Sequence, residues 1–73
     1  MAQGSWRWGI LGAGAAANGM AAALQAVNGG IQAIASRREE TARTLAGRYG
    51  IGRVHASPEA MLQDPDLDVI YIA

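Results

Sequence analysis

Cysteine is absent from the 73-residue chain, and histidine occurs only once, as His55. Without thiols the chain can form neither a disulfide nor a thiolate metal site, and one histidine cannot build a metal site by itself. The core of so short a chain is only marginally stable when no disulfide or bound metal cross-links it. We therefore expect the isolated chain to be loosely packed and prone to aggregate through exposed strand edges.

Lysine is absent as well, and six arginines balance six acidic residues, so the formal net charge is zero. A surface for nucleic acid or for an anionic membrane requires a clear excess of basic residues, which is missing here. No apolar stretch approaches the roughly 18 residues of a membrane span, and residues 1–5 lack the features of a signal peptide. These absences predict a soluble, cytoplasmic α/β chain with no nucleic-acid or membrane partner.

Three apolar segments have the composition of buried strands. Residues 6–11 are aromatic and aliphatic, residues 31–35 alternate Ile with Ala, and residues 69–73 are continuously apolar. A continuous apolar run is typical of a parallel strand that is buried on both faces. We predict that these three segments are strands and that residues 54–55 form a brief extended piece.

The residues between the strands have helical patterns. A first helix is predicted from residue 15 to about 27, with Met20, Leu24 and Val27 on one face and Asn-Gly-Gly at 28–30 as its stop. A second is predicted from Ser36 to about residue 49, with Ser36 and Glu39 spaced as a capping box.

Two glycines, at 50 and 52, end this second helix, and Ser-Pro-Glu at 57–59 starts a short third one. Asp-Pro-Asp at 64–66 interrupts the third helix before the last strand. Strands that alternate with helices in this way predict a parallel sheet with right-handed crossovers.

The clearest motif is Gly12-x-Gly14-x-x-Ala17, which follows the first predicted strand and begins the first predicted helix. In a dinucleotide-binding turn the first glycine permits the tight turn, the second leaves room for the pyrophosphate, and the third position must be small for helix–strand packing. The helix N-terminus then offers free N–H groups to the phosphates. The motif alone is weak evidence, because a chain rich in Gly and Ala can contain it by chance. Its position between a predicted strand and a predicted helix favours a dinucleotide site over a plain glycine turn on an unrelated α/β chain.

The predicted fold is therefore α/β, a partial Rossmann fold with a parallel sheet in the order strand, helix, strand, helix, helix, strand. Residues 1–73 would form the N-terminal part of the dinucleotide-binding domain. Because the chain stops on an apolar strand, we expect a truncated domain that ends before the catalytic segment and the substrate domain of a longer protein.

The end of the second predicted strand distinguishes NADP from NAD. An NAD site usually places Asp or Glu there to bind the ribose 2′-hydroxyl, but this chain has Ser36, Arg37 and Arg38. A hydroxyl and guanidinium groups would bind a 2′-phosphate, which a carboxylate would repel. The alternative is that Ser36 caps the helix while both arginines are solvated. Because cations in a first helical turn are mildly unfavourable, we favour NADP over NAD as the cofactor.

Other polar and aromatic residues are weaker candidates for a functional site. His55 is interpreted as a surface or packed histidine rather than a catalytic base. Asp64, Asp66 and Asp68 have the spacing of a metal loop, but Pro65 intervenes and the glycine and glutamate of an EF-hand are missing. We interpret them as a solvated connection. The two tryptophans at 6 and 8 are interpreted as core or interface groups.

Three blocks together resemble the N-terminal domain of the Gfo/Idh/MocA family (glucose–fructose oxidoreductase, inositol dehydrogenase and MocA). They occur in the family's order and spacing and are RWGILGAGAAA at 7–17, AIASRREE at 33–40 and SPEAMLQDPDLDVIYIA at 57–73. The resemblance implies cofactor contacts of two kinds. Gly12, Gly14, Ala15 and Ala16 would contact the pyrophosphate, with Ala17 in the same cofactor-binding turn, and Ser36, Arg37 and Arg38 would contact the 2′-phosphate. Ala16-Ala17 departs mildly from the Ile-Ala pair that is common in the family.

The resemblance also implies the activity of the parent protein, an NADP-dependent dehydrogenase. It would transfer hydride to or from an alcohol carbon of a sugar, polyol or diol, and the family's catalytic lysine and oligomerising substrate domain would lie outside this chain. The 73-residue chain alone is then expected to be inactive, and the full-length protein to be a homo-oligomer. Two alternatives are a non-catalytic NAD(P)-sensing module and a methyltransferase, but the latter usually carries an acid where Ser36 stands.

Overall fold

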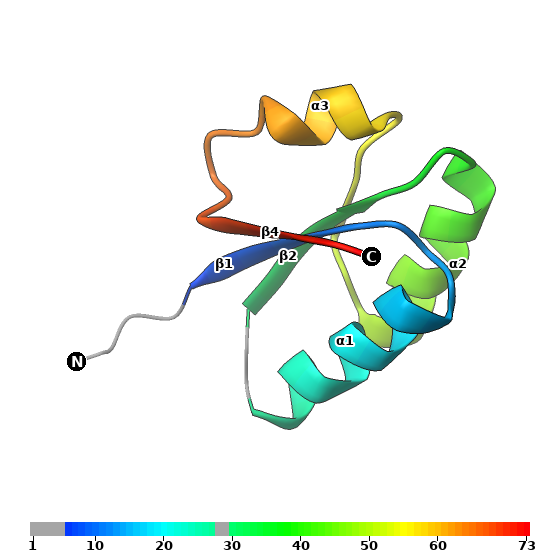
Figure 1. Cartoon of the computed structure of the whole chain (residues 1–73), viewed down its shortest axis with the longest axis vertical. Coiled ribbons are helices and arrows are strands. Elements are labelled where there is room, and N and C mark those ends of the chain that lie inside the picture. The colour runs from blue at the N-terminus through cyan, green and yellow to red at the C-terminus, as the bar shows by residue number, and fades with distance from the viewer. Residues whose placement is uncertain (1–5, 28–29) are drawn as a thin grey trace.

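The computed structural model describes residues 6–27 and 30–73. A four-stranded parallel sheet in the order β3-β2-β1-β4 forms the centre, with helices α1 and α2 on one side and α3 on the other (Figure 1). The elements are β1 (Arg7–Leu11), α1 (Ala15–Ala26), β2 (Gly30–Ala35), α2 (Glu39–Tyr49), β3 (Arg53–Val54), α3 (Pro58–Leu62) and β4 (Val69–Ile72).

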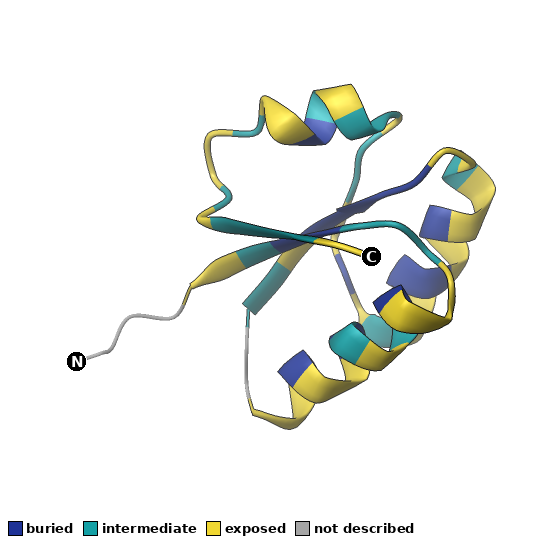
Figure 2. Ribbon diagram, in the orientation of Figure 1, coloured by how far each residue is buried: buried dark blue, intermediate teal, exposed yellow. Residues whose placement is uncertain are grey.

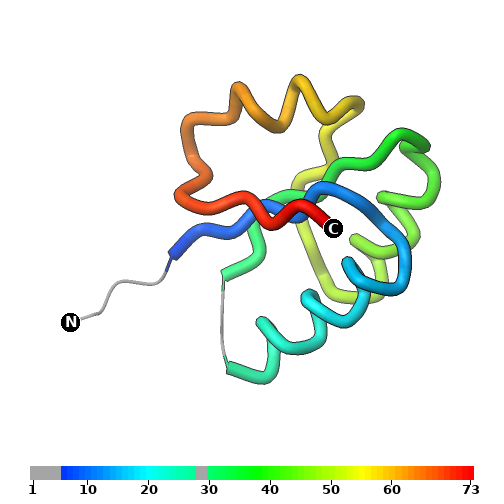
Figure 3. Tube along the Cα trace, viewed as in Figure 1, coloured from blue at the N-terminus to red at the C-terminus, as the bar shows by residue number. Residues whose placement is uncertain are grey.

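The parallel α/β sheet predicted from the sequence is confirmed, with one strand more than expected. The brief extended piece lies at Arg53–Val54 rather than at 54–55, and it pairs with Ala33 and Ile34 as edge strand β3. The next residue, His55, still donates its backbone N–H to the carbonyl of Ile34 at 2.9 Å. The other edge of the described sheet is β4, which runs parallel beside β1 (Figure 3).

The core is divided by the sheet, because successive residues of a strand point to opposite faces. On the α1–α2 side, Ile10 and Ile34 pack with a row of small and aliphatic helical residues. On the α3 side, Ala33 and Ala35 pack against Met61. Figure 2 shows this division as buried residues on the sheet and on the inward sides of the helices.

The buried face of α1 is narrower than the sequence predicted. Ala17, Ala21 and Leu24 are its buried residues, Met20 packs partly against them, and Val27 is 74% exposed. The prediction for Val27 was wrong because α1 ends at Ala26, so Val27 lies past the last residue of the helix. The Asn28-Gly29 part of the predicted stop lies outside the described residues.

The two tryptophans at the start of the sheet differ in burial. Trp8 packs partly against the core of the α1–α2 side, whereas Trp6 is 62% exposed. Among the residues that the structure describes, no helix has the length and apolar character needed to cross a bilayer.

We predict that Met61→Ala lowers the free energy of unfolding by about 2–4 kcal/mol, because a fully buried side chain would leave a cavity under α3. The neighbouring Leu62→Ala, at a position that is 62% exposed, should change it by less than about 1 kcal/mol. Urea denaturation followed by circular dichroism measures both. Equal losses for the two variants would show that α3 does not pack on the sheet as described.

Candidate cofactor-binding site

The turn between β1 and α1 is tied to both strands that flank β1. Gly12 has φ of 126° and donates its N–H to the carbonyl of Ala35 at 2.7 Å, while the N–H of Ala73 binds the carbonyl of Leu11 at 2.9 Å. A Cβ added to Gly12 would lie 3.1 Å from the Cβ of Ala73. Both the backbone angle and the close contact require glycine here.

Gly14 is glycine for a different reason. It is the N-cap of α1 and has φ of −86°, which any residue can adopt. A Cβ added to it would meet nothing within 4 Å. The protein's own packing therefore does not require this glycine, and the open space beside it is what a pyrophosphate would need to approach the backbone.

The first turn of α1 leaves backbone donors available. No side chain caps the helix and no acid lies in its first turn, and the first helical bond runs from Asn18 N–H to the carbonyl of Gly14 at 3.0 Å. The N–H groups of Ala15 and Ala16 come before Asn18 in the chain and so have no partner within the helix, and both residues are exposed. This end of the helix can therefore accept an anion.

Ala17, the third position of the motif, is fully buried against Ile10 and Ile34. Its small side chain lets α1 lie close to the sheet, as the motif requires. A contact between Ala17 and a cofactor stays a prediction.

The loop from β2 to α2 brings the other predicted residues to the same edge of the sheet. Ser36 follows β2 directly and is 7% exposed, and its Oγ donates to the carbonyl of Arg38 at 2.5 Å. The same Oγ lies 3.0 Å from Oγ1 of Thr41. Since Gly12 is bonded to Ala35, the residue before Ser36, the glycine turn and this loop are adjacent.

The predicted capping box of Ser36 and Glu39 was wrong. The chain uses residues 36–38 to turn from β2, so α2 begins at Glu39, and its N-cap is Arg38 without a side-chain cap. The carboxylate of Glu39 instead binds Arg43 one turn along the helix, with 2.9 Å to its Nε. Glu39 is thus held by a cation on its own helix.

Arg37 and Arg38 are both exposed. Neither guanidinium forms an ion pair within residues 6–27 and 30–73, where the arginines that do are Arg7, Arg43 and Arg53. No carboxylate occupies positions 36–38. The loop therefore presents two cations at the end of β2 and no acid to repel a phosphate.

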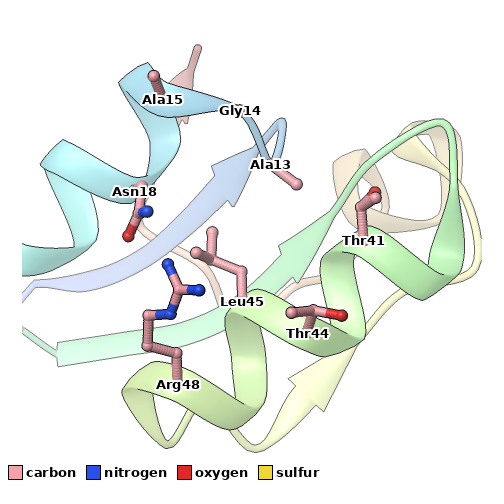
Figure 4. Close-up of a pocket in the computed structure, with 8 residues that line it drawn as sticks. All are labelled: Ala13, Gly14, Ala15, Asn18, Thr41, Thr44, Leu45 and Arg48. Atoms are coloured by element: carbon pink, nitrogen blue, oxygen red, sulfur yellow. The ribbon is translucent and has the colours of Figure 1, made fainter.

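A pocket of about 360 Å³ lies between the glycine turn and α2 (Figure 4). The residues of α2 that line this pocket were not predicted from the sequence. Thr41, Thr44 and Arg48 are spaced three and four residues apart and so share one face of the helix, a signal that was present in the sequence. The full lining is Ala13, Gly14, Ala15, Asn18, Thr41, Thr44, Leu45 and Arg48.

Polar contacts hold α1 against α2 near this pocket, which Asn18 lines. The hydroxyl of Tyr49 donates to the side chain of Asn18, and the side-chain amide of Gln25 donates to the carbonyl of Tyr49 at 2.5 Å. Because Asn18 is one turn from Gly14, these bonds help to set the distance between the glycine turn and α2.

The aspartates and His55 lie on the α3 side, away from this pocket. Asp64 binds Nη1 of Arg53 at 2.7 Å and Nε2 of His55 at 2.8 Å, while Asp68 binds Arg7 at 3.1 Å. The described residues contain no cluster of His, Cys, Asp and Glu that could hold a metal ion. The expectation of a fully solvated connection was wrong for Asp64, whose side chain is 3% exposed.

Comparison with known proteins agrees with this geometry. Residues 6–73 match the model of the Gfo/Idh/MocA family, described as an oxidoreductase family with an NAD-binding Rossmann fold. The chain belongs to this family. The resemblance inferred from the sequence is thereby confirmed. In Rossmann folds generally, the dinucleotide binds at the glycine turn on the carboxyl edge of the sheet.

Three relatives illustrate the match. The trans-1,2-dihydrobenzene-1,2-diol dehydrogenase of Xenopus tropicalis is 39% identical over 69 residues, which are 90% of this chain and 21% of that protein. The structure of KijD10, a 3-ketoreductase from Actinomadura kijaniata in complex with TDP-benzene and NADP, is 31% identical with a TM-score of 0.81, covering 93% of this chain and 22% of the other.

The structure of myo-inositol dehydrogenase from Lactobacillus casei, in complex with NAD(H) and myo-inositol, has a TM-score of 0.89 at 22% identity. It covers 96% of this chain and 22% of the other, and at that identity it shows the fold alone. The chain spans about a fifth of the length of the curated relatives that it matches.

We predict different effects of alanine at the two glycines of the turn. Gly12→Ala should lower the free energy of unfolding by about 1–3 kcal/mol, because its φ of 126° is strained for an L-residue. Gly14→Ala should change stability by less than about 1 kcal/mol but weaken dinucleotide binding, because its methyl would enter the open space. Chemical denaturation and calorimetric titration measure the two effects. Equal destabilisation by both variants would contradict the distinction.

We predict that the Asp64 cluster makes stability depend on acid pH. The guanidinium of Arg53, with the Asp66 N–H and His55, holds the pKa of the Asp64 carboxyl well below its usual value. A carboxyl with a lowered pKa stabilises the fold above its unfolded pKa of about 4, and this contribution is lost as the pH falls below that value.

At pH 7 the free energy of unfolding of Asp64→Asn should therefore be lower than that of the unmodified chain. On acidification, the free energy of unfolding should fall less in the variant than in the unmodified chain. The matched control is Asp66→Asn, since Asp66 also binds Arg53 but its side chain is 56% exposed. Urea denaturation at pH 7, about 5 and about 3 would measure the difference. An unchanged pH dependence in Asp64→Asn would contradict the assignment.

Proposed function

We propose that this chain is the cofactor-binding part of an NADP-dependent dehydrogenase. The observation that carries the proposal is the loop after β2, where residues 36–38 include two exposed arginines that form no ion pair among the described residues, and no carboxylate. The backbone bond from Gly12 to Ala35 brings this loop next to the glycine turn. A 2′-phosphate needs donors and positive charge, whereas a ribose 2′-hydroxyl is usually bound by an acid.

The residues present fit a dinucleotide. The open space beside Gly14 admits the pyrophosphate to the backbone, and the exposed N–H groups of Ala15 and Ala16 would donate to its oxygens. Arg37 and Arg38, with the hydroxyls of the Ser36 loop, would hold the adenosine 2′-phosphate. When bound, the nicotinamide ring supplies or accepts the hydride, while this chain binds and orients the cofactor.

The substrate class is proposed from the relatives. Their names describe a dehydrogenase of a dihydrodiol and a 3-ketoreductase, both of which interconvert an alcohol and a carbonyl carbon. A sugar, polyol or diol is the corresponding substrate for the longer protein. Because the chain contains no lysine, the lysine that the family uses for proton transfer must come from outside it, and the chain alone should be inactive.

We propose two further properties of the longer protein. The family resemblance implies a homo-oligomer, since the family's substrate domain mediates assembly. The composition of the chain favours a location in the cytoplasm.

We predict that Arg37→Ala in the full-length protein raises the Kd for NADP about tenfold and leaves the Kd for NAD within about twofold. The reason is the loss of a charge-assisted bond that only the 2′-phosphate makes. Isothermal titration calorimetry with both dinucleotides measures the ratio.

The matched control is Arg43→Ala, which removes the same charge from an exposed arginine one turn into α2, where it is paired with Glu39. This control should leave the NADP/NAD ratio unchanged. If Arg37→Ala also left the ratio unchanged, the assignment of the 2′-phosphate site would be wrong.

A further inference from the structure

The hydroxyl groups of Ser36 and Thr41 form a triangle with the carbonyl of Arg38. Ser36 Oγ lies 2.5 Å from that carbonyl oxygen, Thr41 Oγ1 lies 2.8 Å from it, and the two hydroxyl oxygens are 3.0 Å apart. Each hydroxyl has only one hydrogen to donate. Two hydrogens cannot serve three contacts, so at any moment one contact of the triangle lacks a hydrogen.

The carbonyl of Arg38 has more donors than it needs. Besides the two hydroxyls, the backbone N–H groups of Thr41 and Ala42 point to it at 3.2 and 3.3 Å. A carbonyl oxygen has two lone pairs, so the loss of one donor leaves it satisfied. One of the two hydroxyl hydrogens can therefore turn to a ligand without leaving an unpaired buried acceptor.

Burial decides which hydroxyl is free to turn. Ser36 is 7% exposed and makes the shortest bond of the triangle, whereas Thr41 is exposed. Thr41 lines the pocket beside Ala13 and Gly14, and Ser36 does not. Figure 4 shows Thr41 on the side of α2 that faces this turn.

We propose that Thr41 donates the hydroxyl contact to the adenosine 2′-phosphate, and that Ser36 acts as a positioning residue behind it. Ser36 satisfies the Arg38 carbonyl, so the Thr41 hydrogen can rotate about its Cβ–Oγ1 bond toward the phosphate while the oxygen stays in place. This inference rests on the proposed NADP preference and names a specificity-determining residue within that site.

The test compares five variants of the full-length protein, four single and one double, by calorimetric titration with NADP and with NAD. Thr41→Val, which removes the hydroxyl at constant shape, should raise the Kd for NADP about tenfold, the loss expected for one hydrogen bond to a charged group. The Kd for NAD should stay within about twofold, because NAD has no 2′-phosphate. Thr41→Ser should restore NADP binding.

Thr44→Val is the matched control. Thr44 lies one turn further along α2 and lines the same pocket, but its hydroxyl donates to the carbonyl of Glu40 at 3.0 Å. This variant should change the two dissociation constants by the same factor, so that their NADP/NAD ratio stays as it is. A selective loss of NADP affinity in Thr44→Val equal to that in Thr41→Val would overturn the proposal, because the effect would then belong to the helix surface in general.

Ser36→Ala distinguishes contact from positioning. In the unmodified background it should weaken NADP binding, because the Arg38 carbonyl then keeps only two long N–H contacts, at 3.2 and 3.3 Å. The Thr41 hydroxyl, at 2.8 Å, is its one remaining short donor and is held back from the phosphate. In the Thr41→Val background it should have no further effect. If Ser36→Ala weakens NADP binding equally in both backgrounds, Ser36 itself contacts the phosphate and the proposal fails.

The outcome also separates this inference from the proposed function. Loss of NADP preference in Arg37→Ala together with an unchanged Thr41→Val would overturn the role of Thr41 alone. An unmodified protein that binds NAD as tightly as NADP would overturn the proposed cofactor preference and the role of Thr41 with it.

Discussion

The whole site depends on one backbone conformation, that of Gly12. At φ of 126° the chain leaves β1 in a direction that an L-residue rarely takes, and its N–H is bonded to the last residue of β2. This turn starts α1 with an open N-terminus at the carboxyl edge of the sheet. Its bond to Ala35 also brings the loop after β2 next to that helix, so the two parts of the candidate site lie side by side.

The two glycines of the turn therefore serve different physical needs. Gly12 is constrained by the protein itself, through its φ and the nearby Cβ of Ala73. Gly14 has an ordinary φ and empty space around it, so nothing in the described fold requires it to lack a side chain. A residue that the fold does not need to be glycine, but that is glycine beside free backbone donors, is typical of a surface built for a ligand.

Most of the architecture was predictable because its signals are local. Each of these signals depends only on the few residues that form it. They are the apolar runs, the small residues of α1, the Ser-Pro start of α3 and Gly50, which ends α2 in the left-handed region. The predictions that were wrong depended on how elements meet. Val27 has helical spacing, but the helix stops before it, and Ser36 has the spacing of a cap although the strand-to-helix turn needs residues 36–38.

The sequence by itself determined the fold class, the position of the glycine turn and the absence of an acid after β2, because these follow from residue type and order. Only the tertiary structure decided that the Ser36 hydroxyl is buried while Thr41 lines the pocket, and that Asp64 is paired rather than solvated. Those properties depend on distances between residues that are separated in sequence, such as Arg53 and Asp64, or on the direction of a side chain in the folded chain. Spacing along a sequence carries no information about either until the sheet has brought the segments together.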